Sequence, residues 1–409
     1  MSLSELDMEL MMPSSQAVWI DQGSCCIEEF ARTVDVETHA ASVPLADEIV
    51  SKIPVYDSAK IERSLDDAGK IRAYMAEWAQ IFGHGAGIVA FRNAYSDLQI
   101  VDDVTGVLNE IIEEEEATSA GAGDHFATAG ANSRVWNAHE KLCMADPELF
   151  ARYNANALIP LVSRSWLGPL FQVTTQVNVV RPGGQAQTCH RDYHMGFQTC
   201  GELREYPAHI HPVSAALTLQ GAIAHCDMSV ESGPTKLLPY SQTYLPGYFA
   251  AHLPAFRDYF EEHYVQLPLS KGDAMFFNPA TFHAAGENRT MDVHRIANLM
   301  QIGSGYGRSI EIVDRARMSK ALYPRLLSLK QSGALSDRDI DNVVQATAEG
   351  YPFPVNLDID SPLSGMAPPS QQDLLREALN DAWSTERFVD AVDAQTARKR
   401  SHEPTRSSL

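Results

Sequence analysis

A series of short β-strands, predicted between Phe171 and Ile302, constrains the fold more than any other feature of the sequence. The first strand, 173–180, is rich in β-branched residues and ends at the turn Arg181-Pro182-Gly183-Gly184. Short strands separated by Gly and Pro are typical of a sandwich or jelly roll, and not of alternating strand–helix–strand units. We therefore predict a mainly β core, with further strands at 215–224, 237–239, 265–267, 274–277 and 294–302.

Helical periodicity flanks this series on both sides. A stripe of apolar residues from Ile71 to Phe82, spaced three and four apart, predicts a helix that Asp66 or Asp67 can cap. A short buried strand, 87–91, follows it. Further helices are predicted at 100–116, 145–166, 317–330 (interrupted at Pro324), 336–348 and from Ser370 onward.

These changes of pattern divide the chain into three parts. Residues 1–65 have weak periodicity and are predicted to be an N-terminal arm packed on the main body. Residues 66–310 form the main domain, and 311–409 form a helical C-terminal extension with a disordered tail. The predicted fold is thus a mainly β core with a helical N-terminal segment and a helical extension.

The composition excludes several classes of partner. The 409 residues include 53 acidic and 32 basic side chains, which give a net charge of −21. Such a balance disfavours nucleic acid and an anionic membrane surface, because both require basic residues. Six Cys without a CxxC pair, no apolar run long enough to span a membrane and an acidic first segment favour a cytoplasmic location.

Metal-capable side chains provide the first indication of function. His190 and Asp192 are two residues apart, so on an extended strand they point to the same face and can reach one ion. His283 supplies a third ligand. Two His and one carboxylate form the facial triad that leaves three positions open on non-heme Fe(II).

Spacing alone does not select this pair. His225 and Asp227 have the same spacing, and His209 and His211 form an HxH pair. A hydrogen-bonded histidine beside a surface aspartate is the ordinary structural explanation for any one of these pairs.

A resemblance decides between them. Residues 70–305 resemble the phytanoyl-CoA dioxygenase family of Fe(II)/2-oxoglutarate oxygenases in the order and spacing of their motifs. The resemblance implies a double-stranded β-helix, which is a cupin-like jelly roll, and makes 66–310 the dioxygenase domain. The matching motifs are Pro182-Gly183-Gly184, Gln187, 190–194, 232–241, 271–277, 283–289 and Arg295, with 87–93 as the first strand.

The resemblance also implies roles for individual residues. His190, Asp192 and His283 would be the iron ligands, and Arg295 would pair with the distal carboxylate of 2-oxoglutarate. A guanidinium suits this role because it binds a carboxylate with two hydrogen bonds and stays charged when buried. Arg289 is the alternative for this arginine. Two further polar residues, Gln187 and Thr235, resemble the family's contacts to 2-oxoglutarate.

Substrate residues are expected just past the ligands and in the 120–140 loop. Tyr193, His194 and Gln198 could line the substrate side, as could Arg134 and Trp136 if that loop folds over the pocket. For each of them a core or surface role is an equal alternative.

The expected function is oxidation of a small molecule with Fe(II), 2-oxoglutarate and O2. The carboxylate ligand Asp192 favours hydroxylation, desaturation or ring formation over halogenation, for which the resemblance implies a small residue at this position. We expect a metabolite of specialised metabolism as substrate, and a homo-oligomer is possible. The alternatives are a cupin-like Zn or Mn hydrolase or isomerase that uses His209 and His211, and a non-catalytic jelly-roll protein.

Overall fold

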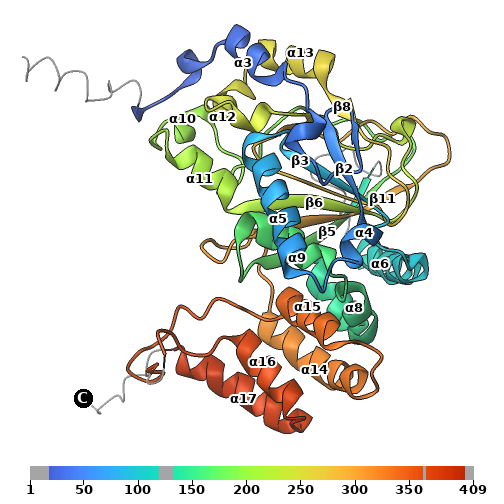
Figure 1. Cartoon of the computed structure of the whole chain (residues 1–409), viewed down its shortest axis with the longest axis vertical. Helices are drawn as coiled ribbons and strands as arrows, with labels where there is room; N and C mark the ends of the chain where they lie inside the picture. The colour runs from blue at the N-terminus through green and yellow to red at the C-terminus, as the bar shows by residue number, and fades with distance from the viewer. Residues whose placement is uncertain (1–17, 119–131, 363–364, 401–409) are drawn as a thin grey trace, which may run out of the picture.

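Two β-sheets form the core of the protein, whose computed structural model describes residues 18–118, 132–362 and 365–400 (Figure 1). The main sheet has eight strands in the order β1-β2-β3-β9-β6-β11-β5-β4, and the second has three in the order β10-β7-β8. Within the main sheet, β2 and β3 pair in parallel and the other neighbours are antiparallel. The strands are β1 (Glu48–Val50), β2 (Ile53–Asp57), β3 (Ile88–Arg92), β4 (Asn132–Val135), β5 (Gln172–Val180), β6 (Thr218–Ala224), β7 (Lys236–Leu238), β8 (Val265–Gln266), β9 (Ala274–Phe277), β10 (Phe282–Ala284) and β11 (Arg295–Gly303).

One face of the main sheet is covered by helices (Figure 1). The inner strands of the sheet send alternate side chains, such as Val177, Ile223 and Phe276, into a core shared with these helices. Asp67 caps the helix that begins at Ala68 by accepting a hydrogen bond from the Lys70 N–H, which confirms the predicted start of this helix. The helices are α5 (Ala68–His84), α6 (Leu98–Thr118), α7 (Ala138–Ala145), α8 (Pro147–Asn154) and α9 (Leu158–Leu167).

The prediction of one helix over 145–166 is wrong, because the structure has two. Asp146 caps α8 by accepting a hydrogen bond from the Leu149 N–H. Asn156 then accepts a hydrogen bond from the Leu158 N–H, and a separate helix, α9, begins at Leu158. Two capping side chains within this segment compete with the helical pattern that the apolar residues suggest.

Shorter helices, which sequence reasoning did not predict, lie toward the top of the molecule in Figure 1. Phe30 of α3 is fully buried there and packs against Phe256 and Phe282, with ring centroids 5.1 and 5.0 Å away. These helices are α3 (Ile27–Val34), α10 (Cys200–Leu203), α11 (Ile210–Ala216), α12 (Gly247–Ala250) and α13 (Pro254–His263).

Residues 1–65, expected to form an arm, contribute to the main sheet. Strands β1 and β2 extend it at the edge, where β2 pairs with β3, and α4 (Ser58–Glu62) follows them. Residues 1–17 of this arm lie outside the described residues, as do 119–131 of the expected loop and 401–409 of the expected tail.

The helical extension packs below the sheet-covering helices (Figure 1). It consists of α14 (Arg315–Gln331), α15 (Asp337–Thr347), α16 (Gln371–Asn380) and α17 (Thr385–Arg398). Buried Arg315 donates hydrogen bonds to Val173 O of β5 and to carbonyls at the end of α15, which ties the extension to the main sheet. Pro324 lies inside α14 without ending it.

The architecture confirms the predicted fold class. Short strands in two sheets form the core, and helices precede and follow these strands in the sequence. Across the described ranges, no helix combines the length and the apolar character needed to cross a membrane.

Candidate active site

Backbone pairing between distant segments brings His190 and His283 together. The His190 N–H donates to His283 O over 3.0 Å, and the His283 N–H donates to His190 O over 3.1 Å. This isolated antiparallel bridge sets the two imidazole rings side by side, with centroids 4.4 Å apart. Two segments that are far apart in the sequence thus supply neighbouring ligands.

Each imidazole is oriented by its own backbone. Nδ1 of His190 donates to Thr188 O over 2.9 Å, and Nδ1 of His283 donates to Thr281 O over 2.8 Å. With the proton held on Nδ1, the lone pair is on Nε2 and faces Asp192. The Nε2 atoms lie 3.8 and 3.7 Å from the two carboxylate oxygens of Asp192.

Asp192 completes the cluster and is held from two sides. Its N–H donates to Pro279 O over 3.1 Å, and its Oδ2 accepts a hydrogen bond from the Gln220 side chain of β6. Burial alone would raise the pKa of the Asp192 carboxyl, but the adjacent imidazoles of His283 and His190 and the hydrogen bond from Gln220 hold it well below its usual value. Burial, followed by the neighbouring His283, lowers the pKa of His190. Both shifts favour the forms that bind a metal, which are the carboxylate and the neutral imidazole.

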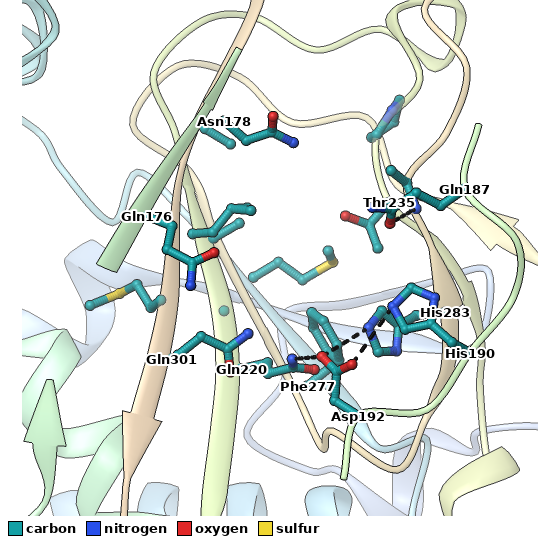
Figure 2. Close-up of a pocket in the computed structure, with 18 of the residues that line it drawn as sticks. Gln176, Asn178, Gln187, His190, Asp192, Gln220, Thr235, Phe277, His283 and Gln301 are labelled. Atoms are coloured by element: carbon teal, nitrogen blue, oxygen red, sulfur yellow. Dashed lines mark hydrogen bonds and ion pairs between the residues drawn. The ribbon is translucent and has the colours of Figure 1, made fainter. Parts of the chain in front are cut away.

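The geometry fits one metal ion. The ligand atoms of His190, Asp192 and His283 all lie within 4.8 Å of one another, and in the described part of the chain no other group of three His, Cys, Asp or Glu does so. Figure 2 shows the three side chains converging at one end of the pocket. Two imidazoles and one carboxylate are the donor set that non-heme Fe(II) enzymes use.

The rival pairs are arranged differently. Both ring nitrogens of His225 are engaged, by Thr105 Oγ1 at 2.8 Å and by the Tyr153 hydroxyl at 2.9 Å. Asp227 is exposed and accepts a hydrogen bond from the Lys271 N–H. His209 is exposed at the start of α11, whereas His211 is 1% exposed and packs among aromatic rings.

A cavity of about 490 Å³ opens beside the metal ligands. Strand alternation builds its wall, because every second residue of β11 faces it. Arg295, Ala297, Leu299 and Gln301 all line the cavity.

Three arginines line the cavity, Arg134, Arg257 and Arg295, and of these Arg295 alone is buried. It is 6% exposed, and its Nη1 has no hydrogen-bond partner in the structure. Burial lowers the pKa of its guanidinium to about 10, so the group stays charged at neutral pH. Arg289, in contrast, is exposed and does not line the cavity. A buried guanidinium with an unpartnered N–H fits the carboxylate of a bound 2-oxo acid.

Gln187 and Thr235 also line this cavity and lie close to each other above the histidines (Figure 2). The Gln187 side-chain oxygen accepts a hydrogen bond from the Ala285 N–H over 3.2 Å, which leaves its amide N–H groups available. Gln187 thus also supports the backbone of the segment that follows His283.

The expected substrate residues separate into two groups. A second cavity of about 110 Å³ adjoins the first and is lined by Arg134, Trp136, Tyr193 and His194. Arg134 lines both cavities and donates to the Gln176 side chain. Gln198 lines neither cavity and donates to Met195 O.

Sequence reasoning missed a row of amides on the cavity wall. Gln176, Gln220 and Gln301 come from the neighbouring strands β5, β6 and β11 (Figure 2). Asn178 pairs with Ala297, two residues after Arg295. Gln220 matters most, since it holds the carboxylate of Asp192. Polar amides at alternate positions of otherwise apolar strands were the available signal.

Comparisons with known proteins identify the family of the chain. The family model described as phytanoyl-CoA dioxygenase (PhyH) matches residues 83–297, and the chain belongs to this family. It is therefore an Fe(II)- and 2-oxoglutarate-dependent enzyme that uses O2, as the motifs predicted. A search of curated proteins found no match.

Solved structures with a similar fold include two enzymes of nogalamycin biosynthesis. The non-heme α-ketoglutarate-dependent epimerase SnoN is 19% identical, with a TM-score of 0.41, over 57% of this chain and 84% of its own. The carbocyclase SnoK is 20% identical, with a TM-score of 0.40, over 58% of this chain and 84% of its own.

Proposed function

We propose that this enzyme oxidises a small organic metabolite, with His190, Asp192 and His283 as iron ligands and Arg295 as the 2-oxoglutarate anchor. The observation that carries the proposal is the cavity itself. It places an oriented His–Asp–His cluster and a buried guanidinium with an unpartnered N–H in one space. Fe(II) and 2-oxoglutarate held by these residues would supply, with O2, an oxidant able to remove hydrogen from a carbon of the substrate.

The chain's own residues position the reactants. Arg295 binds the distal carboxylate of 2-oxoglutarate with its guanidinium, and Thr235 and Gln187 offer hydrogen bonds nearby. The hydrogen bonds from Nδ1 of both histidines prevent the imidazoles from turning away from the centre. Gln220 holds one oxygen of Asp192, which orients the carboxylate toward the histidines.

Asp192 also bears on the type of reaction. Its carboxylate occupies the position that a halide would need, so hydroxylation, desaturation or ring formation is favoured over halogenation. Cavities of about 490 and 110 Å³ fit a co-substrate together with a small substrate. Arg134, Trp136, Tyr193 and His194 form the substrate side of this arrangement. Specialised metabolism as the setting stays our proposal.

The test is succinate formation. Purified protein with Fe(II), ascorbate and 2-oxoglutarate should release succinate slowly without substrate, and His190→Ala should abolish this release. A protein that releases none under any substrate screen, or a His190→Ala variant equal to wild type, would contradict the assignment. Indifference to 2-oxoglutarate would instead favour the hydrolase or isomerase alternative.

The division into three parts, the cytoplasmic location and a homo-oligomer stay predictions. Neither nucleic acid nor a membrane surface is proposed as a partner, since the net charge of −21 disfavours both.

A further inference from the structure

A third cavity lies behind the segment that carries His190 and Asp192. Its volume is about 400 Å³, and it is separate from the two cavities of the candidate active site. Arg191, the residue between the two metal ligands, lines it together with His84, His211, Gln242 and Tyr248. We call it the rear cavity.

The rear cavity is cationic in an acidic chain. None of its lining residues is Asp or Glu, although acidic side chains outnumber basic ones by 53 to 32 in the whole protein. Its lining includes one arginine and two histidines. A wall free of acids in such a chain favours an anion.

Arg191 is a buried cation without an acidic partner. Its side chain is 7% exposed and donates to the carbonyls of Tyr244 (3.1 Å) and Ser241. Aromatic rings of Tyr248 and Phe282 lie 5.4 and 4.9 Å from its Cζ. No carboxylate of the described residues forms an ion pair with it, and its Nε has no hydrogen-bond partner. A buried charge of this kind is costly unless a counter-charge compensates it.

His211 adds an independent donor at the same cavity. It is 1% exposed, and neither of its ring nitrogens has a hydrogen-bond partner. Tyr193, Tyr248 and Phe249 surround the ring, with centroids 5.8, 6.0 and 5.7 Å away. Buried polar atoms are nearly always paired, so two unpaired nitrogens on a ring that borders the cavity indicate a missing partner.

We propose that the rear cavity binds a small oxyanion, a carboxylate or a phosphate, between Arg191 and His211. The guanidinium supplies charge and N–H donors, and an imidazole N–H supplies another donor. The site is distinct from the 2-oxoglutarate pocket and does not depend on the proposed function.

The location gives the site a consequence for the metal centre. Arg191 follows His190 and precedes Asp192, and the Tyr248 hydroxyl donates to Asp192 O over 3.4 Å. An anion bound to Arg191 therefore strengthens the support of the segment that holds two ligands. Organic acids or phosphate would in this way stabilise the enzyme from outside its active site.

The test uses full-length, metal-free protein titrated with sodium acetate or sodium phosphate at constant ionic strength, with chloride as the replacement. Thermal unfolding should shift upward by on the order of 2 °C and saturate with concentration. The anion that gives the tighter saturation identifies the class. Arg295→Met should keep the shift, because it alters the other pocket.

Two variants test the location. His211→Phe keeps an aromatic ring among its aromatic neighbours and should abolish most of the shift. His84→Asp places a negative charge at an exposed position of the cavity wall and should weaken anion binding severalfold, whereas the matched His84→Asn should not. No saturable shift in wild type would overturn the proposal. A shift that disappears in Arg295→Met but persists in His211→Phe and His84→Asp would overturn it as well.

Discussion

Two segments with the same local sequence pattern, His190-Arg191-Asp192 and His225-Cys226-Asp227, have different structural roles. In the first, the two ring nitrogens of His190 differ, because Nδ1 is held by a carbonyl and Nε2 faces the carboxylate. In the second, both nitrogens of His225 are bonded to side chains of the core. Asp227 meanwhile faces outward.

The difference shows what a metal pair requires beyond spacing. A ligand histidine needs a nitrogen that no protein group uses and a carboxylate on the same side. His225 instead joins Thr105 of α6 to Tyr153 of α8, so it stabilises the packing of helices on the sheet.

The largest effect should separate the two aspartates. Asp192→Ala removes a charged ligand and should weaken Co(II) binding to the metal-free protein more than about 100-fold, which is the upper range for residues that only support a ligand. Asp227→Ala should leave binding within about twofold. Spectroscopic titration with Co(II) measures both, and equal losses would mean that the metal lies elsewhere.

The second prediction concerns acid stability. Burial lowers the pKa of His225 to about 4, against 6.5 in an unfolded chain. The unfolded state thus binds the extra proton, so the stability from neutral His225 is complete above pH 6.5 and is lost as pH falls toward 4. The loss should amount to about 3 kcal/mol in wild type.

His225→Gln should lack this part of the pH dependence, as measured by urea unfolding between pH 7 and 4. Buried His139 also has a lowered pKa, but it is common to both proteins and cancels in the difference. Parallel pH curves for wild type and variant would contradict the assignment of His225 to the core.

A smaller effect should separate the two arginines. Arg295→Met leaves the distal carboxylate of 2-oxoglutarate without its partner and should raise the KM for 2-oxoglutarate roughly 30-fold, or about 2 kcal/mol. Arg289→Met should change it less than twofold, since Arg289 is exposed and outside the cavity. A larger increase of this KM in Arg289→Met than in Arg295→Met would instead assign the binding of the distal carboxylate to Arg289.

Long or strongly patterned segments could be predicted from the sequence. The apolar stripe and Asp67 predicted α5, and Ser336 with Asp339 forms the expected capping box of α15. Strands β1, β2, β4 and β10 were not predicted, because segments of three to five residues show too little alternation. Three of them, β2, β4 and β10, pair with strands distant in the sequence, and β1 pairs with the adjacent β2.

Part of the candidate site could also be predicted from the sequence. The motifs named His190, Asp192, His283 and Arg295, and the structure brings all four to one cavity. Gln198 lies outside it, because its amide bonds locally to Met195 O. Gln220 was missed, since its contact with Asp192 crosses 28 residues of chain.

The sequence by itself determined the residue types, their order and the two-residue spacing that lets His190 and Asp192 share a face. It also determined the family, through motifs spread over 83–297. Tertiary structure decided which of two equal pairs keeps a free nitrogen. The partners that occupy His225 lie 120 and 72 residues away in the chain, and His283 reaches His190 only through a backbone bridge. Spacing fixes direction within one strand, whereas occupancy of a ring nitrogen depends on which distant side chain packs against it.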